Sequence, residues 1–274
     1  MTEIEALPVI SVIMGVLYRS GDAAMLQRAV RSILAQSFPH FELLVCDDGS
    51  SEAAKRYLEE AAGQDKRIKL IRPGDRFSLP EKLNVCLKAA RGTYIARMDD
   101  DDYALPDRFA QQLEFLERHP QTAFVGCNVN LIRGGEPVGK RQLPEYPDVK
   151  DFYMTQPYIH PTLLFRKACL DAVSGYSEDK RCILCEDYDL LLRLYEVGYS
   201  GANLQEPLLD YTIPSSAKGS RRMCHRRNEA VTRFRRFRAL GLLPGAFPYV
   251  LKPLAVGLLP EGVLRLVKSK TTEK

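Results

Sequence analysis

The chain of 274 residues is 45% hydrophobic and 27% charged, and its formal net charge is +4. This composition is typical of a globular protein that is long enough to bury a sizeable core in one large domain. No apolar run reaches the roughly 18 to 20 residues of a membrane-spanning helix, and the acidic N-terminus is unlike a basic signal peptide. We therefore expect a cytoplasmic protein.

Strand and helix patterns alternate through the first half of the chain and become less regular in the second. The strands are short continuous apolar runs, as in a sheet covered on both faces, and the helices place apolar residues three and four positions apart. This order predicts an α/β fold with a doubly wound, mainly parallel sheet. Strands are expected at 9–14, 41–46, 68–71, 93–98, 123–129, 162–165 and 203–213, and helices at 26–34, 52–62, 80–90 (closed by Gly92), from Pro106 onward and at 186–197.

Two acidic turns follow strands of this sheet: Asp47-Asp48, and the run from Asp99 to Asp102. Sheets of this kind bind ligands at the carboxyl ends of their strands. Adjacent carboxylates repel one another unless a cation neutralises them, and a cluster of oxygen ligands alone selects hard ions such as Mg²⁺ or Mn²⁺. Strand alternation would turn Asp99 and Asp101 toward one ligand, and Asp100 away from it. A solvated acidic loop is the alternative for this run taken by itself.

The seven cysteines are scattered along the chain, which favours reduced, buried thiols over a disulfide framework. Cys182 and Cys185 form the only CxxC pair, without the second pair or the histidines of a zinc site. We interpret them as small buried side chains, with redox chemistry as the alternative.

Taken together, five segments resemble glycosyltransferase family 2, whose members are inverting nucleotide-sugar enzymes with a GT-A-type fold. They occur in the order and at the spacing of the family, and the resemblance covers about residues 8 to 213. It implies a GT-A-type domain over 1–215, with a Rossmann-like nucleotide-sugar-binding half at about 8–105 and an acceptor half at 106–215, before a basic, helical extension over 216–274. The segments are PVISVIM (8–14), AVRSILAQSFPHFELLVCDDGSSE (29–52), ARGTYIARMDDDDYALPDR (90–108), HPTLLFRK (160–167) and EDYDLLLRL (186–194).

The resemblance implies a role for each of five residues. Asp48 would hydrogen-bond the base of the nucleotide, and Tyr18 would pack on that base. Asp99 would lie on the ribose and metal side of the D-x-D motif, and Asp101 would bind the cation that bridges the diphosphate. Asp187 would be the catalytic base.

Three further residues are candidates for contacts with the acceptor or with phosphate: His160, Glu186 and Arg193. His160 could instead satisfy a turn, and Arg193 could form a structural salt bridge. The Glu186-Asp187 pair could be an ordinary acidic helix start, because acidic side chains are favoured at that end of a helix. The matched register of EDYDLLLR favours the functional interpretation.

Two departures from the family pattern bear on function. The segment Gly15–Arg19 replaces the Tyr-Asn that the family usually has after the first strand, so Tyr18 stands in an altered context. The chain contains no tryptophan and therefore lacks the Q-x-x-R-W signature of processive synthases. Together with the absence of long apolar runs, this favours the transfer of one sugar at each encounter.

The C-terminal extension is charged oppositely to the rest of the chain. Residues 217–274 carry 14 Lys and Arg against 3 Asp and Glu, which leaves 25 basic and 32 acidic residues before them. Arginines surround a narrow apolar stripe of Val231, Phe234 and Phe237, and apolar pieces broken by prolines follow. This pattern fits attachment of residues 217–267 to an anionic membrane surface, or packing on the domain or in an oligomer. It fits nucleic acid least, because no nucleic-acid module accompanies it.

These features predict a metal-dependent, inverting glycosyltransferase that uses Mn²⁺ or Mg²⁺. It would move one sugar from a UDP-linked donor to a hydroxyl of a glycan or lipid-linked glycan in cell-surface polysaccharide biosynthesis, as a peripheral protein at the inner face of the cell membrane. The alternative is a catalytically silent nucleotide-binding or membrane-scaffolding protein with the same fold. A sugar-nucleotide pyrophosphorylase would need a glycine-rich, arginine-containing loop after the first strand, which residues 15–22 do not supply.

Overall fold

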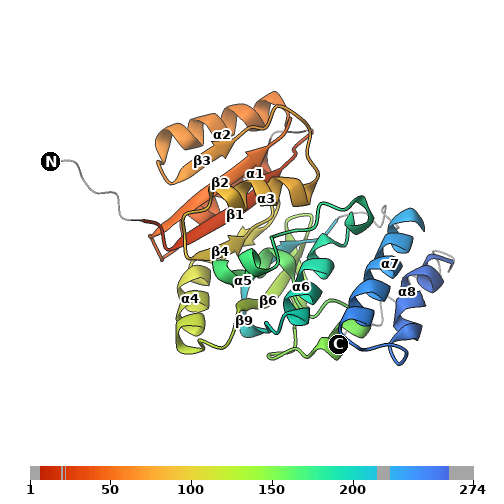
Figure 1. The fold of residues 1–274 in the computed structure, drawn as a ribbon. Coiled ribbons are helices and arrows are strands. Elements are labelled where there is room, and N and C mark those ends of the chain that lie inside the picture. Colours follow the sequence, from red (N-terminus) through yellow and green to blue (C-terminus); the bar gives the residue numbers. More distant parts are fainter. Residues whose placement is uncertain (1–6, 20, 22, 215–222, 259–274) are drawn as a thin grey trace.

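One nine-stranded sheet runs through the protein, with helices on both of its faces (Figure 1). The computed structural model describes residues 7–19, 21, 23–214 and 223–258. The strand order is β3-β2-β1-β4-β8-β6-β9-β5, and β7 pairs with β6 outside this path. The strands are β1 (Ile10–Val16), β2 (Phe41–Asp47), β3 (Ile68–Ile71), β4 (Tyr94–Arg97), β5 (Tyr103–Ala104), β6 (Phe124–Arg133), β7 (Glu136–Arg141), β8 (Leu164–Arg166) and β9 (Gly201–Thr212).

The first four strands of the sheet are parallel, as the sequence predicts for the nucleotide-binding half. β1 pairs in parallel with both β2 and β4, and β2 pairs in parallel with β3. β8 then runs antiparallel between β4 and β6, while β6 and β9 are parallel again. The prediction of an α/β fold with a mostly parallel sheet is therefore confirmed.

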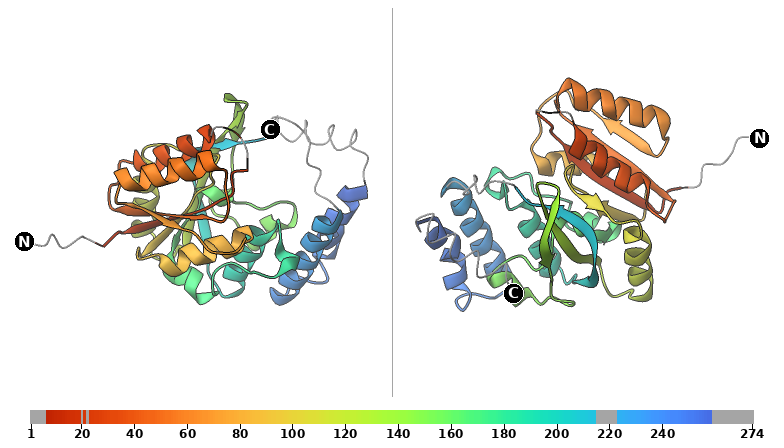
Figure 2. Two further views of the ribbon diagram at one scale, coloured as in Figure 1. Left: turned by 90° about the horizontal axis from the view of Figure 1, so that it is seen from above. Right: turned by 180° about the vertical axis from the view of Figure 1, so that it is seen from behind.

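Helices cover both faces because alternate residues of each strand point in opposite directions. On β1, Ile10, Val12 and Met14 belong to one core, whereas Ile13 belongs to the other. Figure 2 shows the two helical layers from above and from behind. The first core contains α1 (Ala24–Leu34), α2 (Glu52–Gln64) and α4 (Arg108–Arg118), and the second contains α3 (Leu79–Ala89), α5 (Lys167–Ala172) and α6 (Glu186–Glu196).

The fourth helix begins at Arg108, close to its expected start near Pro106. Two other expected boundaries are wrong, each for a local reason. The strand expected at 162–165 begins at Leu164, because His160–Thr162 forms a 3₁₀ turn. Gly92 does not close α3, which ends at Ala89 with Ala90 extended. A Cβ at Gly92 would lie 2.6 Å from the backbone nitrogen of Ser11, so close packing requires glycine there.

The described part of the basic extension packs on the domain. α7 (Met223–Ala239) lies beside α6, and α8 (Phe247–Leu258) folds back along α7 (Figure 1). Of the predicted apolar stripe, Phe237 is buried but Phe234 is exposed. Arg233 is buried instead, with its guanidinium 4.7 Å from the Tyr188 ring centroid. No described helix is both long enough and apolar enough to span a membrane. The parts of this extension at 216–222 and 259–274 lie outside the described residues.

The cysteines are mostly buried, as expected. Six of the seven are buried, and Cys224 on α7 is exposed. The sulfurs of Cys182 and Cys185 lie 4.0 and 3.5 Å from the Thr232 hydroxyl of α7. The CxxC pair therefore forms part of the contact between the domain and the extension.

Candidate active site

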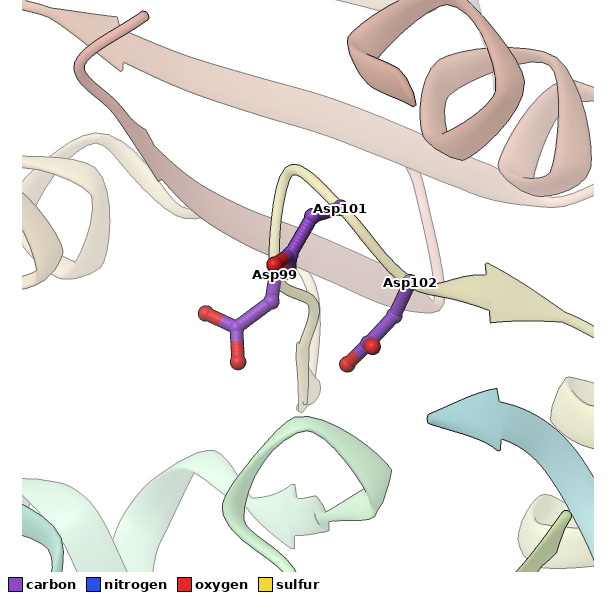
Figure 3. A group of neighbouring side chains, drawn as sticks. All are labelled: Asp99, Asp101 and Asp102. Carbon is purple, nitrogen blue, oxygen red and sulfur yellow. The ribbon is translucent and has the colours of Figure 1, made fainter. Parts of the chain in front are cut away.

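Three carboxylates converge in the turn between β4 and β5 (Figure 3). Asp99, Asp101 and Asp102 each present an oxygen, and these oxygens lie within 4.8 Å of one another. The sequence predicts Asp99 and Asp101 together, but it omits Asp102. Strand alternation does not explain the arrangement, because β4 ends at Arg97 and the aspartates stand in a turn.

Buried hydrogen bonds hold this turn in place from two sides. The Arg108 guanidinium at the start of α4 donates to the carbonyl of Arg97 at 2.8 Å. Thr212, the last residue of β9, donates through its hydroxyl to the carbonyl of Asp101 at 2.6 Å. Its backbone N–H donates to the Asp102 carboxylate at 2.7 Å. The turn is therefore fixed before any ligand arrives.

The clustered carboxylates are difficult to ionise together, because they are partly buried and repel one another. Burial, together with the charge of Asp99, raises the pKa of Asp101 to about 6 and that of Asp102 to about 8. Burial also raises the pKa of Asp100. The second carboxylate oxygen of Asp102 is buried without a hydrogen-bond partner. An all-oxygen donor set with this excess negative charge fits Mn²⁺ or Mg²⁺.

Arg97 is a site residue that the sequence reasoning misses. It is the last residue of β4, only 1% exposed, and its guanidinium pairs with the Asp99 carboxylate at 2.5 Å. Burial opposes its charge, but Asp99 and Tyr176 outweigh this effect and raise its pKa. Arg97 thus remains a cation beneath the acidic turn. The sequence feature that could have indicated Arg97 is an arginine at the end of an otherwise apolar strand.

Asp48 and Tyr18, the predicted base contacts, lie in two adjoining loops. The Tyr18 N–H donates to the Ser50 hydroxyl at 2.9 Å, two residues beyond Asp48. The Asp48 side chain is only 1% exposed, accepts a hydrogen bond from the Phe77 N–H at 2.8 Å and pairs with Lys82 at 2.5 Å. Their roles stay predictions, and Lys82 is a buried partner that the sequence did not suggest.

Glu186 and Asp187 begin α6 on the opposite side of the site. The side-chain amide of Gln156 donates to one carboxylate oxygen of Asp187 at 3.1 Å, and the Tyr188 N–H donates to the other at 2.8 Å. Glu186 is buried, and burial followed by the like charge of Asp187 raises its pKa to about 7. Gln156 lies 31 residues before Asp187, so no local pattern revealed this contact.

His160 and Arg193 take different positions. His160 is buried and its Nε2 lies 2.7 Å from the Tyr176 hydroxyl. Burial and the Arg97 charge lower its pKa well below the usual range, so it is a neutral polar group facing the site. Arg193 instead bonds to Asp189 at 2.8 Å and to the carbonyls of Val173 and Gly175. These contacts are those of a structural salt bridge, and a contact of Arg193 with phosphate stays a prediction.

A cavity of about 500 Å³ connects the two acidic regions. Its lining includes Arg97, Asp99, His160, Glu186 and Asp187. Of the predicted site residues, four are not part of its lining: Tyr18, Asp48, Asp101 and Arg193. The extension contributes residues that no sequence pattern predicts here, including Arg226 of α7 and Lys252 of α8.

Sequence comparison agrees with this geometry. The model of Glycosyl transferase family 2 matches residues 11–172, which is more than half of the chain. The chain belongs to glycosyltransferase family 2. EpsE of Bacillus subtilis (strain 168) is 34% identical over 264 residues, spanning 96% of this chain and 94% of EpsE. The amylovoran biosynthesis glycosyltransferase AmsE of Erwinia amylovora is 26% identical, over 93% of this chain and 96% of its own length.

Solved structures confirm the GT-A-type fold of this glycosyltransferase. TarS of S. aureus (residues 1–349), in complex with UDP-GlcNAc, has a TM-score of 0.69 at 17% identity over 89% of this chain and 72% of that chain. The mannosyltransferase PcManGT from Pyrobaculum calidifontis, in complex with GDP-Man and Mn²⁺, has a TM-score of 0.59 at 17% identity, over 98% of this chain and 82% of its own. The enzyme class predicted from the sequence is also confirmed by the family membership.

Proposed function

We propose that this glycosyltransferase moves one sugar from a UDP-linked donor to a hydroxyl of a glycan or lipid-linked glycan, with inversion and with a divalent cation. A nucleotide-sugar donor is supported by TarS with UDP-GlcNAc and by PcManGT with GDP-Man. A role in surface polysaccharide biosynthesis is supported by AmsE and by WbnJ of Escherichia coli, an O-antigen biosynthesis glycosyltransferase that is 31% identical over 68% of this chain.

The observation that carries the proposal is one cavity lined by both Asp99 and Asp187. A donor diphosphate beside the acidic turn would leave its anomeric carbon facing into this cavity. An acceptor hydroxyl entering from the α6 side would then meet that carbon and Asp187 together. Two separate sites on opposite surfaces would not permit a direct transfer.

Asp187 acts as the general base in this scheme. As the acceptor oxygen attacks the anomeric carbon, its proton passes to the Asp187 carboxylate, and the bond from that carbon to the diphosphate oxygen breaks. A single displacement inverts the anomeric centre and requires no second carboxylate as nucleophile. The Gln156 amide and the Tyr188 N–H orient the carboxylate by occupying one acceptor position on each oxygen.

Asp101, Asp99 and Asp102 would hold the divalent cation. A cation bound there supplies Lewis-acid stabilisation of the charge that develops on the departing diphosphate. Arg97 holds Asp99 in place from below through their ion pair. Asp48, whose carboxylate accepts from the Phe77 N–H and pairs with Lys82, would also bind the donor base, and Tyr18 would pack on that base.

We also propose that the extension attaches the enzyme peripherally to an anionic membrane surface at the inner face of the cell membrane. Phe234, Phe247 and Leu251 are exposed on α7 and α8, within a region of strongly positive charge. Exposed apolar groups among arginines favour the interface of an anionic bilayer. Cosedimentation with phosphatidylglycerol vesicles, but not with phosphatidylcholine vesicles, is the expected result.

A screen of nucleotide sugars tests the proposed activity. UDP-, GDP- and CMP-linked sugars are incubated with the full chain and Mn²⁺, and slow donor hydrolysis and the melting temperature are recorded. We expect at least one UDP-sugar to raise the melting temperature and to be hydrolysed in Mn²⁺ but not in EDTA. The proposal fails if no nucleotide shifts the melting temperature and no donor is consumed with or without metal.

A further inference from the structure

We infer that α7 and α8 form an acceptor subsite that binds a phosphate ester carrying an apolar chain. This inference rests on the proposed function, because it places the acceptor on the α6 side of the cavity. It specifies the chemical class of the ligand on that side and the residues that bind it. Its residues are Arg226 of α7 with Lys252 and Val256 of α8, and they line the same cavity as Asp187.

The cations of this wall differ from Arg97 and Arg233, which also line the cavity, in having no carboxylate partner. Arg97 is paired with Asp99, and Arg233 is paired with Glu229 at 3.1 Å. Among the residues that the structure describes, no carboxylate lies within 4.0 Å of the charged groups of Arg226 or Lys252. Two unpaired cations in a partly enclosed space favour an anionic ligand over a neutral glycan.

The hydrogen bonds of these two cations leave donors available. Arg226 makes one long hydrogen bond, 3.5 Å, to the carbonyl of Pro253. Lys252 donates to the carbonyl of Met154. Burial, followed by the nearby Arg233, lowers the pKa of Lys252, and the Glu229 carboxylate, which is paired with Arg233, only partly offsets this effect. A phosphate can accept from the remaining N–H groups of both side chains.

A glycine in α8 places the Arg226 side chain against this helix. A Cβ at Gly257 would lie 2.5 Å from Cδ of Arg226 and 2.9 Å from Cε of Met223. The arginine stem therefore lies across the bare backbone of α8.

Apolar side chains accompany the two cations. Val256 and Pro253 line the wall, and Met154 and Leu184 line the cavity while remaining 58% and 45% exposed. Exposed apolar groups beside cations suit a ligand with a charged head and an apolar chain. Inorganic phosphate or pyrophosphate would use the cations but not the apolar groups.

Farnesyl diphosphate is a soluble probe that has both parts. Its binding to the full chain is measured by calorimetry in EDTA, because without a cation the acidic turn repels a diphosphate. We expect binding to the wild type, weaker binding of pyrophosphate, and the weakest binding of farnesol. The double variant Arg226→Gln, Lys252→Gln should weaken farnesyl diphosphate binding at least about tenfold, since each charge-assisted hydrogen bond contributes substantially. The matched control Arg238→Gln removes an exposed charge of α7 and should bind like the wild type.

Gly257→Ala provides a variant that keeps both charges. The added methyl group pushes the Arg226 stem away from α8 without removing a cation, and alanine favours the helix, so folding is retained. Weaker binding of farnesyl diphosphate is expected here too. The inference is overturned if the wild type does not bind this probe in EDTA, or if the double variant binds it as well as Arg238→Gln does. The nucleotide-sugar screen in Mn²⁺ separates the two proposals. Donor hydrolysis without probe binding overturns the subsite alone. Probe binding with neither hydrolysis nor a nucleotide-induced shift in melting temperature overturns the transferase proposal and leaves a phosphate-ester site that is not an acceptor subsite.

Discussion

The two acidic regions of the cavity are built in opposite ways. In the turn after β4, three carboxylates crowd within 4.8 Å, and burial with mutual repulsion raises the pKa of two of them. At the start of α6, Asp187 receives hydrogen bonds on both of its oxygens from Gln156 and the Tyr188 N–H. The first arrangement needs a positive charge to be stable, whereas the second already stabilises an ionised carboxylate.

This contrast separates two tasks that acidic residues perform in one reaction. A crowded cluster of carboxylates binds cations, since a divalent ion relieves the repulsion among the carboxylates. A single, well-oriented carboxylate accepts a proton from a hydroxyl placed beside it. In the proposed reaction the acidic turn would be the cation site and Asp187 the proton acceptor, with Asp99 and Asp187 lining one cavity.

The largest expected effect is the loss of turnover on substitution of the proton acceptor. Asp187→Asn keeps the shape of the side chain but removes its basicity, so transfer should fall about 10²- to 10⁴-fold. Donor binding should persist, because the acidic turn is untouched. Steady-state transfer rates and the UDP-induced shift in melting temperature, both in Mn²⁺, measure the two effects. Unchanged turnover would show that Asp187 is not the base and would favour another role for the start of α6.

A smaller expected effect concerns the cation built into the acidic turn. Arg97→Met removes the ion-pair partner of Asp99, although the buried Arg108 guanidinium remains near the turn. The free energy of unfolding should fall by about 2–4 kcal/mol, near the lower end of values for broken buried pairs, because Asp99 is 31% exposed. Urea denaturation at pH 8 measures the loss. Arg97→Lys is the matched control and should recover part of it; equal stability of Arg97→Met and wild type would contradict the role given to this ion pair.

The smallest expected effect is a pH dependence at the start of α6. The pKa of Glu186 is raised to about 7 in the folded protein, so its protonated form contributes stability below its ordinary pKa, and this contribution is lost as the pH rises through 7. Glu186→Gln should therefore raise the free energy of unfolding by about 1–3 kcal/mol at pH 8 and change it little at pH 4.5. Denaturation of both proteins across this range measures the difference, and an equal effect at both pH values would show that Glu186 ionises normally.

The sequence predicts most of the fold because the central strands can be recognised from their local residue pattern. β1, β2 and β4 are continuous apolar runs, and each ends close to the expected residue. The short β5 and the exposed β7 have no such pattern and were not predicted. Arg193 shows the corresponding limit for a site. Its salt bridge with Asp189, four residues earlier, is a local pairing that the sequence allows. Its hydrogen bonds to the carbonyls of Val173 and Gly175, about twenty residues earlier in the chain, are revealed only by the folded structure.

Tertiary contacts explain the other omissions at the site. Asp102 joins the acidic turn because Thr212 of β9 orients it, 110 residues further along the chain. Arg226 and Lys252 reach the cavity because α7 packs beside α6 and α8 packs along α7. Local patterns identify an acidic run and a basic helix, but they do not specify which of these charges face one another.

Manganese binding to the acidic turn is the most direct measurement. In a titration followed by electron paramagnetic resonance, the free Mn²⁺ signal should decrease on addition of the wild type, and more strongly with UDP present. Asp101→Asn should weaken this binding at least about tenfold, whereas Asp100→Asn, outside the converging group, should bind nearly as the wild type does. A free-ion signal that persists at saturating UDP, or equal binding by Asp101→Asn and wild type, would contradict the cation site on which the proposed reaction depends.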